Sequence, residues 1–206
     1  AHEIKNPLTP MRLSVQNFQR RFSPDDPQCS EKVADFTQML LQHIDTLSDI
    51  SDAFSSFVSM PPQKKEQAEL NTIIRHAIAI FDLPYIRFES KQEQICLWVD
   101  KNQMNRMLTN LLKNAIYATD NIPDPLIEVT TYVIGDFAYI VVKDNGSGVP
   151  PELQERIFEP KFTTKNTAGS GLGLTMVKHI INAHGGTITL NSEVNKGATF
   201  TVELKK

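Results

Sequence analysis

The 206-residue sequence has little cysteine and no long apolar run, and each absence excludes a class of protein. Its two cysteines, Cys29 and Cys96, lie in different segments and lack the spacing of metal ligands. They therefore predict reduced thiols in a cytosolic setting, without a disulfide framework or a zinc site. No apolar run approaches the roughly 18 residues needed to cross a bilayer, and no signal peptide is present. We therefore expect a soluble, cytoplasmic portion of a protein.

The sequence also lacks an excess of positive charge. It has 21 basic and 24 acidic residues, for a net charge of −3, and no basic stripe or polycationic run. This balance argues against nucleic acid or an anionic membrane surface as a partner. With 40% hydrophobic and 22% charged residues, the chain has the composition of a globular protein with one large or two modest domains.

Two long helices are predicted in the first sixty residues, because apolar residues recur at alternating steps of three and four, as in a heptad seam. A polar break at residues 23–27 separates them. The seams are Ile4, Leu8, Met11, Val15, Phe18 and Phe22, then Val33, Phe36, Leu40, His43, Leu47, Ile50, Phe54 and Phe57. Such narrow seams bury too little surface alone, so we expect an antiparallel hairpin that dimerises into a four-helix bundle. His43 is expected to form a polar layer of that core rather than a catalytic site.

The second helix is expected to extend beyond the first. With the turn centred near residue 26, its last ten residues overhang by about 15 Å, at about 1.5 Å per residue. Phe54 and Phe57 then have no partner on the first helix. We therefore expect the natural protein to continue upstream of Ala1, and any membrane anchor to lie in segments absent from this sequence.

A domain boundary is predicted at Met60–Lys65, where consecutive prolines end the helix. The expected organisation is a helical hairpin over residues 1–60, a linker over 61–66 and a second domain over 67–206. In that domain we expect strands at 68–70, 95–99, 127–134, 139–143, 187–191 and 199–204, and helices at 71–81, 101–119 and 175–183, the first capped by Asn71. Because two pairs of strands are joined by short turns, we expect a mostly antiparallel sheet with helices on one face. The fold class is therefore α+β, with an α/β sandwich after the hairpin.

The chain begins with a candidate nucleophile in the sequence Ala1-His2-Glu3-Ile4-Lys5-Asn6-Pro7. If this segment is helical, His2 and Asn6 share a face that lies off the apolar seam and is exposed. A solvated helix start is the ordinary alternative for a histidine–glutamate pair at a chain terminus. A zincin motif is excluded, because Asn6 stands where the second histidine would be.

Two stretches of the second domain carry side chains suited to a nucleotide. Asn110 and Asn114 are four residues apart on one helix and offer neutral oxygens of the kind that Mg²⁺ accepts, although paired asparagines are also common on helix surfaces. Asp144 follows a strand, and its carboxylate can accept a hydrogen bond from the exocyclic amine of a purine. Gly146 and Gly148 would let the backbone close on the flat base, and a plain tight turn is the alternative.

A third stretch, residues 167–174, is rich in glycine and leads directly into a helix. Gly169, Gly171 and Gly173 would free backbone N–H groups to hold phosphate oxygens, and the helix N-terminus adds a favourable dipole. The glycine spacing does not fit a Rossmann fingerprint, and no Gly-Lys-Ser/Thr ends the stretch as in a P-loop.

In this order the stretches resemble the sensor histidine kinases of two-component systems, especially those of the nitrogen-regulation type. The resemblance covers essentially the whole chain. It relates residues 2–7 to the phosphoacceptor box, 110–115 to the N box, 144–148 to the G1 box, 158–162 to the F box and 169–174 to the G2 box. Lys161 departs from the pattern, because an aromatic residue is common there in related kinases.

The resemblance implies a dimerisation and phosphoacceptor hairpin joined to an ATP-binding domain of the Bergerat type, with a mobile lid between the F and G2 boxes. His2 would accept the γ-phosphoryl group of ATP, with Glu3 orienting its imidazole and accepting its proton. The phosphohistidine would then donate to an aspartate of a response regulator. Asn6 matches the position that orients water for removing the aspartyl phosphate, so we expect an enzyme with both kinase and phosphatase activity.

The same resemblance assigns the nucleotide-binding residues. Asn114 with Asn110 would hold Mg²⁺, and Asp144 would bind adenine. Lys165, near the lid, is a candidate phosphate contact, with solvated lid charge as the alternative. The other residues assigned to ATP are Gly146, Gly148, Gly169, Gly171, Gly173 and Leu174.

Two other functional classes compete with this interpretation. A non-catalytic phosphotransfer or scaffolding protein would keep the fold without turning over ATP, but the intact Asn114, Asp144 and glycine set argues against it. A Bergerat ATPase of the chaperone or mismatch-repair type would lack a histidine hairpin before the nucleotide domain. The handedness of the Ser23–Cys29 connection decides whether transfer occurs within or between subunits.

Overall fold

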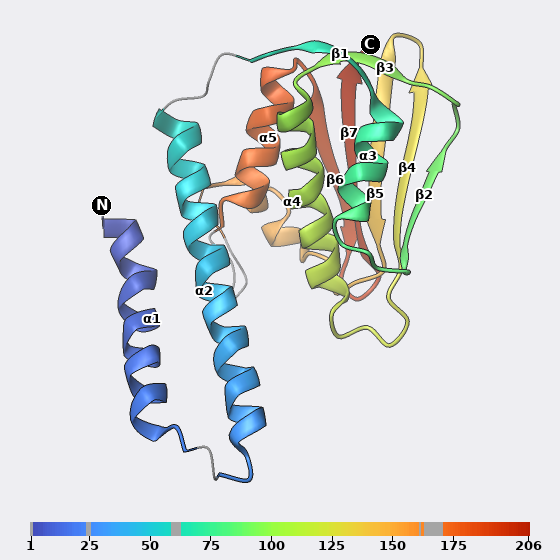
Figure 1. Ribbon diagram of the computed structural model, residues 1–206. Helices are drawn as coiled ribbons and strands as arrows, with labels where there is room; N and C mark the ends of the chain where they lie inside the picture. The colour runs from blue at the N-terminus through green and yellow to red at the C-terminus, as the bar shows by residue number, and fades with distance from the viewer. Residues whose placement is uncertain (1, 24–25, 59–62, 161, 163–170) are drawn as a thin grey trace. The chain divides into compact units, whose positions relative to one another are not determined.

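The computed structural model describes residues 2–23, 26–58, 63–160, 162 and 171–206, and for residues 2–7, 9, 21, 42–43, 45–46 and 48–58 it describes the backbone only. The described chain forms two compact units, a pair of N-terminal helices and an α/β domain (Figure 1). Over these ranges, no helix has the length and apolar character required to cross a membrane.

The first unit consists of α1 (His2–Arg21) and α2 (Cys29–Val58), which run antiparallel (Figure 1). Phe18 of α1 stacks on Phe36 of α2, with the ring centroids 4.1 Å apart and the planes 7° apart. Both rings occupy seam positions of the heptad pattern. Asp26 precedes α2, and its carboxylate accepts hydrogen bonds from the Gln28 backbone N–H and the Lys32 ammonium.

A five-stranded sheet forms the centre of the α/β domain, in the order β2-β4-β5-β7-β6. Its strands are β2 (Ile86–Ser90), β4 (Ile127–Ile134), β5 (Phe137–Asp144), β6 (Thr187–Glu193) and β7 (Gly197–Lys205). The predicted β4–β5 and β6–β7 hairpins are confirmed, and every pairing is antiparallel except that of β2 with β4. The sequence prediction omitted β2, so it missed the parallel pairing that makes the sheet mixed. The omission has a physical cause, since the strand has only five residues and only two of them are apolar.

Three helices cover one face of this sheet (Figure 1): α3 (Leu70–Ala79), α4 (Lys101–Thr119) and α5 (Gly173–Ala183). The strands β1 (Glu66–Glu69) and β3 (Cys96–Val99) form a separate antiparallel pair, and two short 3₁₀ helices, η1 (Pro151–Leu153) and η2 (Arg156–Phe158), follow β5. Cys29 and Cys96 are free thiols, as predicted. The apolar core lies between helices and sheet and includes Met104, Leu108, Leu111, Leu112, Ile127, Val129, Ile140, Val142 and Val202.

The prediction that Asn71 caps α3 is wrong. Glu69 is the cap, because its carboxylate accepts hydrogen bonds from the backbone N–H groups of Asn71 (3.0 Å) and Thr72 (2.6 Å). Asn71 is 1% exposed, and its amide donates to the Gln92 carbonyl and accepts from the Thr131 hydroxyl. Its side chain therefore joins α3 to the β2–β3 connection and to β4, and this tertiary role outweighs its capping propensity.

Candidate functional site

The candidate site is built around Asp144, the last residue of β5. The side chain lies on the covered face of the sheet and the residue is 3% exposed. Its Oδ1 atom accepts hydrogen bonds from the backbone N–H groups of Gly146 (2.9 Å) and Ala198 (3.2 Å). Among the described residues, none donates a hydrogen bond to Oδ2. The strand thus presents a fixed carboxylate with one oxygen left to accept a hydrogen bond from a ligand.

Burial raises the pKa of the Asp144 carboxyl above its ordinary value, and the N–H groups of Gly146 and Ala198 offset part of that rise. A carboxylate that is poorly hydrated and incompletely hydrogen-bonded gains more from an additional donor than an exposed one does. The exocyclic amine of adenine is a donor of the required kind.

The glycines of the following loop admit protein backbone. A Cβ atom at Gly146 would overlap the carbonyl of Ala118, near the end of α4, and Ser147 N–H donates to that same carbonyl (3.1 Å). Gly148 has a φ of +68°, and a Cβ atom there would overlap the carbonyl of Glu193. Both glycines were predicted to make room for the base, whereas the structure shows that they first let the loop pack against α4 and β6.

Further hydrogen bonds tie this loop to the β6–β7 hairpin. Val149 N–H donates to the Ser192 hydroxyl (2.9 Å), which donates to the Gly197 carbonyl (2.7 Å). Asn195 N–H donates to the Ser147 carbonyl (2.8 Å). The loop is therefore held at several points before any ligand binds.

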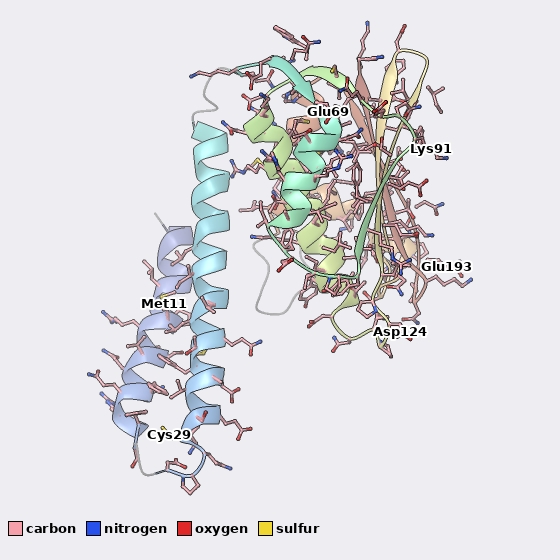
Figure 2. The ribbon with its side chains drawn as sticks, turned by 45° about the vertical axis from the view of Figure 1, so that its right-hand side comes forward. Met11, Cys29, Glu69, Lys91, Asp124 and Glu193 are labelled. Carbon is pink, nitrogen blue, oxygen red and sulfur yellow. The ribbon has the colours of Figure 1, made fainter. Side chains whose placement is uncertain are left out.

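A second anchor lies on the segment between α4 and β4. The Asn145 side chain accepts from Leu126 N–H (2.9 Å) and donates to the Asp124 carbonyl (2.8 Å). Figure 2 shows Asp124 and Glu193 at the same end of the domain, opposite the end that carries Glu69. The candidate site therefore occupies one end of the sandwich.

Asn110, Asn114 and Ala118 follow one another at four-residue steps along one face of α4. The Asn110 amide nitrogen donates to the Arg106 carbonyl (2.9 Å), so the Oδ1 atom is turned away from that bond. This Oδ1 lies 3.2 Å from the place where a Cβ atom of Gly173 would be. The two asparagines thus lie on a row that passes the start of α5 and ends at the Gly146 loop.

The remaining predicted residues have different outcomes. Gly171 has a φ of +66°, a left-handed conformation that favours glycine, and Gly173 and Leu174 begin α5. Lys165 and Gly169 lie outside the described residues. The backbone of His2, Glu3 and Asn6 is helical within α1, and their side chains lie outside the description.

Sequence reasoning missed the residues that hold Asp144 and its loop from a distance, namely Ala118, Ser192 and Ala198. Nothing in the local sequence indicates that the turn between β6 and β7 contacts the loop after β5. The Arg156 guanidinium, in the segment after β5, lies 4.8 Å from the ring centroid of Phe162. In the described ranges, no three His, Cys, Asp or Glu side chains gather as they would in a protein-bound metal site.

Residues 99–206 match the family of histidine kinase-, DNA gyrase B- and HSP90-like ATPases. The nitrogen regulation protein NtrY of Azorhizobium caulinodans is 34% identical over 214 residues, which cover 100% of this chain and 28% of that protein. The chain spans about a third of the length of the curated relatives that it matches.

Solved structures show the same relationship. The catalytic domain of the histidine kinase ThkA has a TM-score of 0.63 at 32% identity, over 69% of this chain and 96% of that domain. ThkA in complex with the response regulator protein TrrA has a TM-score of 0.76 at 27% identity, over 100% of this chain and 59% of that one. The chain therefore belongs to the family of histidine kinase-, DNA gyrase B- and HSP90-like ATPases.

Proposed function

We propose that this chain is the core of an ATP-dependent protein histidine kinase that phosphorylates itself on His2 and passes the phosphoryl group to an aspartate of a response regulator. The observation that carries the proposal is the fixed Asp144 carboxylate, at the end of an α/β domain that matches histidine kinase catalytic domains. A helix that begins with His2 and Glu3 precedes this domain.

ATP would bind at the Asp144 end of the domain. Asp144 would accept a hydrogen bond from the adenine amine, beside the loop that contains Gly146 and Gly148. The phosphates would meet the glycine-rich stretch, where the free N–H groups at the start of α5 favour negative charge. The residues assigned to this part are Lys165, Gly169, Gly171, Gly173 and Leu174.

Mg²⁺ fits the donor set of Asn110 and Asn114. Both side chains offer neutral amide oxygens, and neither belongs to a carboxylate cluster among the residues that the structure describes. Such a set suits an ion that arrives with phosphate and water ligands rather than one enclosed by protein. When bound, Mg²⁺ would neutralise charge on the phosphates during transfer.

His2 would act as the nucleophile. An unperturbed imidazole has a pKa of about 6.5 and is largely neutral at cytoplasmic pH. Glu3 would orient the ring and accept its proton, which leaves the other nitrogen free to attack phosphorus. Because phosphoryl transfer depends mainly on alignment and charge neutralisation, an exposed, neutral imidazole is sufficient.

The helical unit would dimerise into a four-helix bundle. A single chain leaves several apolar side chains of α1, α2 and the segment directly after α1 exposed, and burying them in a second copy would stabilise both helices. The exposed residues are Leu8, Leu13, Val15, Phe22, Val33, Leu41 and Ile44. The domain boundaries proposed for this function are 1–60 for the hairpin, 61–66 for the linker and 67–206 for the ATPase.

The proposed partner is the receiver domain of a response regulator. The complex of ThkA with TrrA supports a partner of this class, since ThkA aligns with the whole of this chain. We place the chain in the cytoplasmic part of a sensor, where ATP and response regulators are available.

The direct test is to incubate the chain with γ-labelled ATP and Mg²⁺ and to examine the bond that forms. A phosphohistidine loses its label in acid and keeps it in alkali, whereas phosphoserine and phosphothreonine behave in the opposite way. We expect acid-labile, alkali-stable label on the peptide that contains residue 2, identified by mass spectrometry under neutral conditions. Label that is stable in acid, or that lies on another peptide, would contradict the proposal.

Asn6→Ala is expected to separate the two proposed activities. Asn6 is one helical turn beyond His2 and is assigned to positioning water, so its loss should spare self-phosphorylation. We expect a labelling rate within about twofold of the unchanged chain, and loss of regulator dephosphorylation by at least roughly tenfold. Labelling is measured with γ-labelled ATP, and dephosphorylation is measured with a phosphorylated receiver domain. An equal loss of the two activities would overturn the role given to Asn6.

A further inference from the structure

The linker enters the ATPase domain through residues 63–65, and these residues are fastened to the ends of two helices. Lys64 N–H donates to the Asp100 Oδ2 atom (3.0 Å), immediately before α4. The Lys65 ammonium donates to the carbonyl of Ala183, the last residue of α5 (3.4 Å). The path of the chain into the domain is therefore fixed by specific hydrogen bonds rather than by peptide connectivity alone.

Asp100 serves two purposes with its two oxygens. Its Oδ1 atom accepts from the backbone N–H groups of Asn102 (3.0 Å) and Gln103 (3.1 Å) and so caps α4. Its Oδ2 atom holds Lys64 N–H. The residue is 9% exposed, so water competes poorly for these bonds. One buried carboxylate thus begins α4 and fastens the linker.

His184 connects the end of α5 to Asp100. Asp100 N–H donates to the His184 Nε2 atom (3.1 Å), so this nitrogen carries no proton. The Nδ1 atom therefore carries the proton and donates to the Ile180 carbonyl in the last turns of α5 (2.8 Å). The neutral ring links the end of α5 to the residue that holds the linker.

The opposite ends of the two helices carry the candidate nucleotide site. Ala118, near the end of α4, supports the Gly146 loop, and Gly173 begins α5 beside Asn110. Figure 2 shows the same separation, with Glu69 at the linker end of the domain and Asp124 at the site end. The helix pair therefore runs from the linker to the nucleotide.

We infer that Asp100 and His184 are positioning residues that clamp the linker to the α4–α5 pair and thereby restrict the orientations from which the ATPase domain delivers the phosphoryl group. The inference rests on the proposed function. A clamped linker lowers the number of unproductive orientations, and alignment supplies much of the rate of phosphoryl transfer. Releasing the clamp therefore slows transfer and leaves nucleotide affinity unchanged, because neither residue belongs to the nucleotide site.

Asp100→Asn tests this inference in the complete 206-residue chain. Asparagine keeps one oxygen, which continues to cap α4, but its NH₂ group cannot accept from Lys64 N–H. We expect the Lys64 amide to exchange with solvent roughly tenfold faster. The initial rate of His2 labelling should fall roughly three- to tenfold, while the Kd for ATP and the Tm change little. His184→Ala, which removes the acceptor for Asp100 N–H, should give the same pattern.

The matched control is Asp136→Asn, which removes the same charge from the exposed turn between β4 and β5. It should leave both Lys64 exchange and labelling at the level of the unchanged chain. Faster Lys64 exchange without slower labelling would overturn the inference, and so would a labelling loss that only follows lost ATP affinity. An unchanged chain that forms no acid-labile label would contradict the proposed function instead. The clamp itself is judged by Lys64 exchange, and unchanged exchange in Asp100→Asn would refute it.

Discussion

Replacing His2 with alanine is expected to abolish phosphorylation of the chain while ATP binding stays at its original level. Alanine has no nucleophilic atom to attack the γ-phosphorus, so the initial rate of labelling should fall by at least about a thousandfold, as when a covalent nucleophile is removed. The ATPase domain contains most of the residues assigned to ATP, namely Asn110, Asn114, Asp144, Gly146, Gly148, Gly173 and Leu174, whereas His2 begins α1 in the other unit. The Kd for ATP should therefore be unaffected. Both quantities can be measured on the same preparation.

Two exposed histidines provide matched controls for this experiment. His76 lies on α3 and His179 lies on α5, and both side chains are exposed. His76→Ala and His179→Ala remove the same imidazole and should be labelled at the rate of the unchanged chain. Acid-labile label that persists in His2→Ala would disprove the central claim. Loss of label in all three variants would show that the effect is not specific to residue 2.

Elements with a long, regular pattern could be predicted from the sequence. The helix at residues 101–119 and the strand at residues 127–134 were predicted with the bounds that the structure shows. Each repeats its apolar period several times, which fixes both its type and its ends. β2 offered only Ile86 and Phe88 as apolar positions, and its parallel partner β4 is distant in sequence. A strand of that kind is defined by its neighbour, which local pattern does not reveal.

The candidate site likewise has a part that could be predicted from the local sequence and a part that could not. Asp144 and its glycines stand next to one another in sequence, so their chemistry could be recognised there. The contacts that fix them come from Ala118, Ser192 and Ala198, which belong to three other elements. The glycines illustrate the consequence. Gly146 and Gly148 were predicted to leave room for the base. The structure shows that backbone carbonyls of the protein occupy the space that a side chain would need at these two positions.

Capping of α3 shows how tertiary contacts override a local preference. Asn71 is a favourable cap residue by type, and Glu69 is less so. Burial of the Asn71 amide against Thr131 and the Gln92 carbonyl nevertheless requires Asn71 to lie inside the helix. The cap then moves to the nearest residue with a free carboxylate.

Asp144→Asn is expected to weaken ATP binding strongly. Asparagine keeps an Oδ1 acceptor for the N–H groups of Gly146 and Ala198, so the loop should retain its anchor. Its NH₂ group replaces Oδ2 and faces the adenine amine as a second donor. Losing one hydrogen bond and leaving a buried donor unpaired costs about 2 to 3 kcal/mol, which corresponds to roughly a 30- to 150-fold rise in Kd. Titration calorimetry with ATP measures this change.

The same substitution is expected to stabilise the fold at neutral pH. Burial raises the pKa of Asp144 above its unfolded value. A group with a raised folded pKa contributes stability below its unfolded pKa, and that contribution is lost as the pH rises through the folded pKa. At pH 7 the ionised carboxylate therefore opposes folding, whereas asparagine does not. The Tm of Asp144→Asn should exceed that of the unchanged chain at pH 7, and the difference should shrink as the pH falls.

Opposite signs for affinity and stability distinguish a ligand-binding role of Asp144 from a structural one. If the Asp144 carboxylate only held the loop in place, its replacement would lower both the Tm of the chain and its affinity for ATP, because the loop would loosen. If the carboxylate instead serves to bind the ligand, its replacement lowers the affinity for ATP and raises the Tm, because the buried charge is unfavourable until a ligand donates a hydrogen bond to it. Asp136→Asn, in an exposed turn, removes an equal charge and should change neither quantity. A joint fall of Tm and affinity in Asp144→Asn would therefore assign the residue to the structure of the loop and remove the main support for adenine binding there.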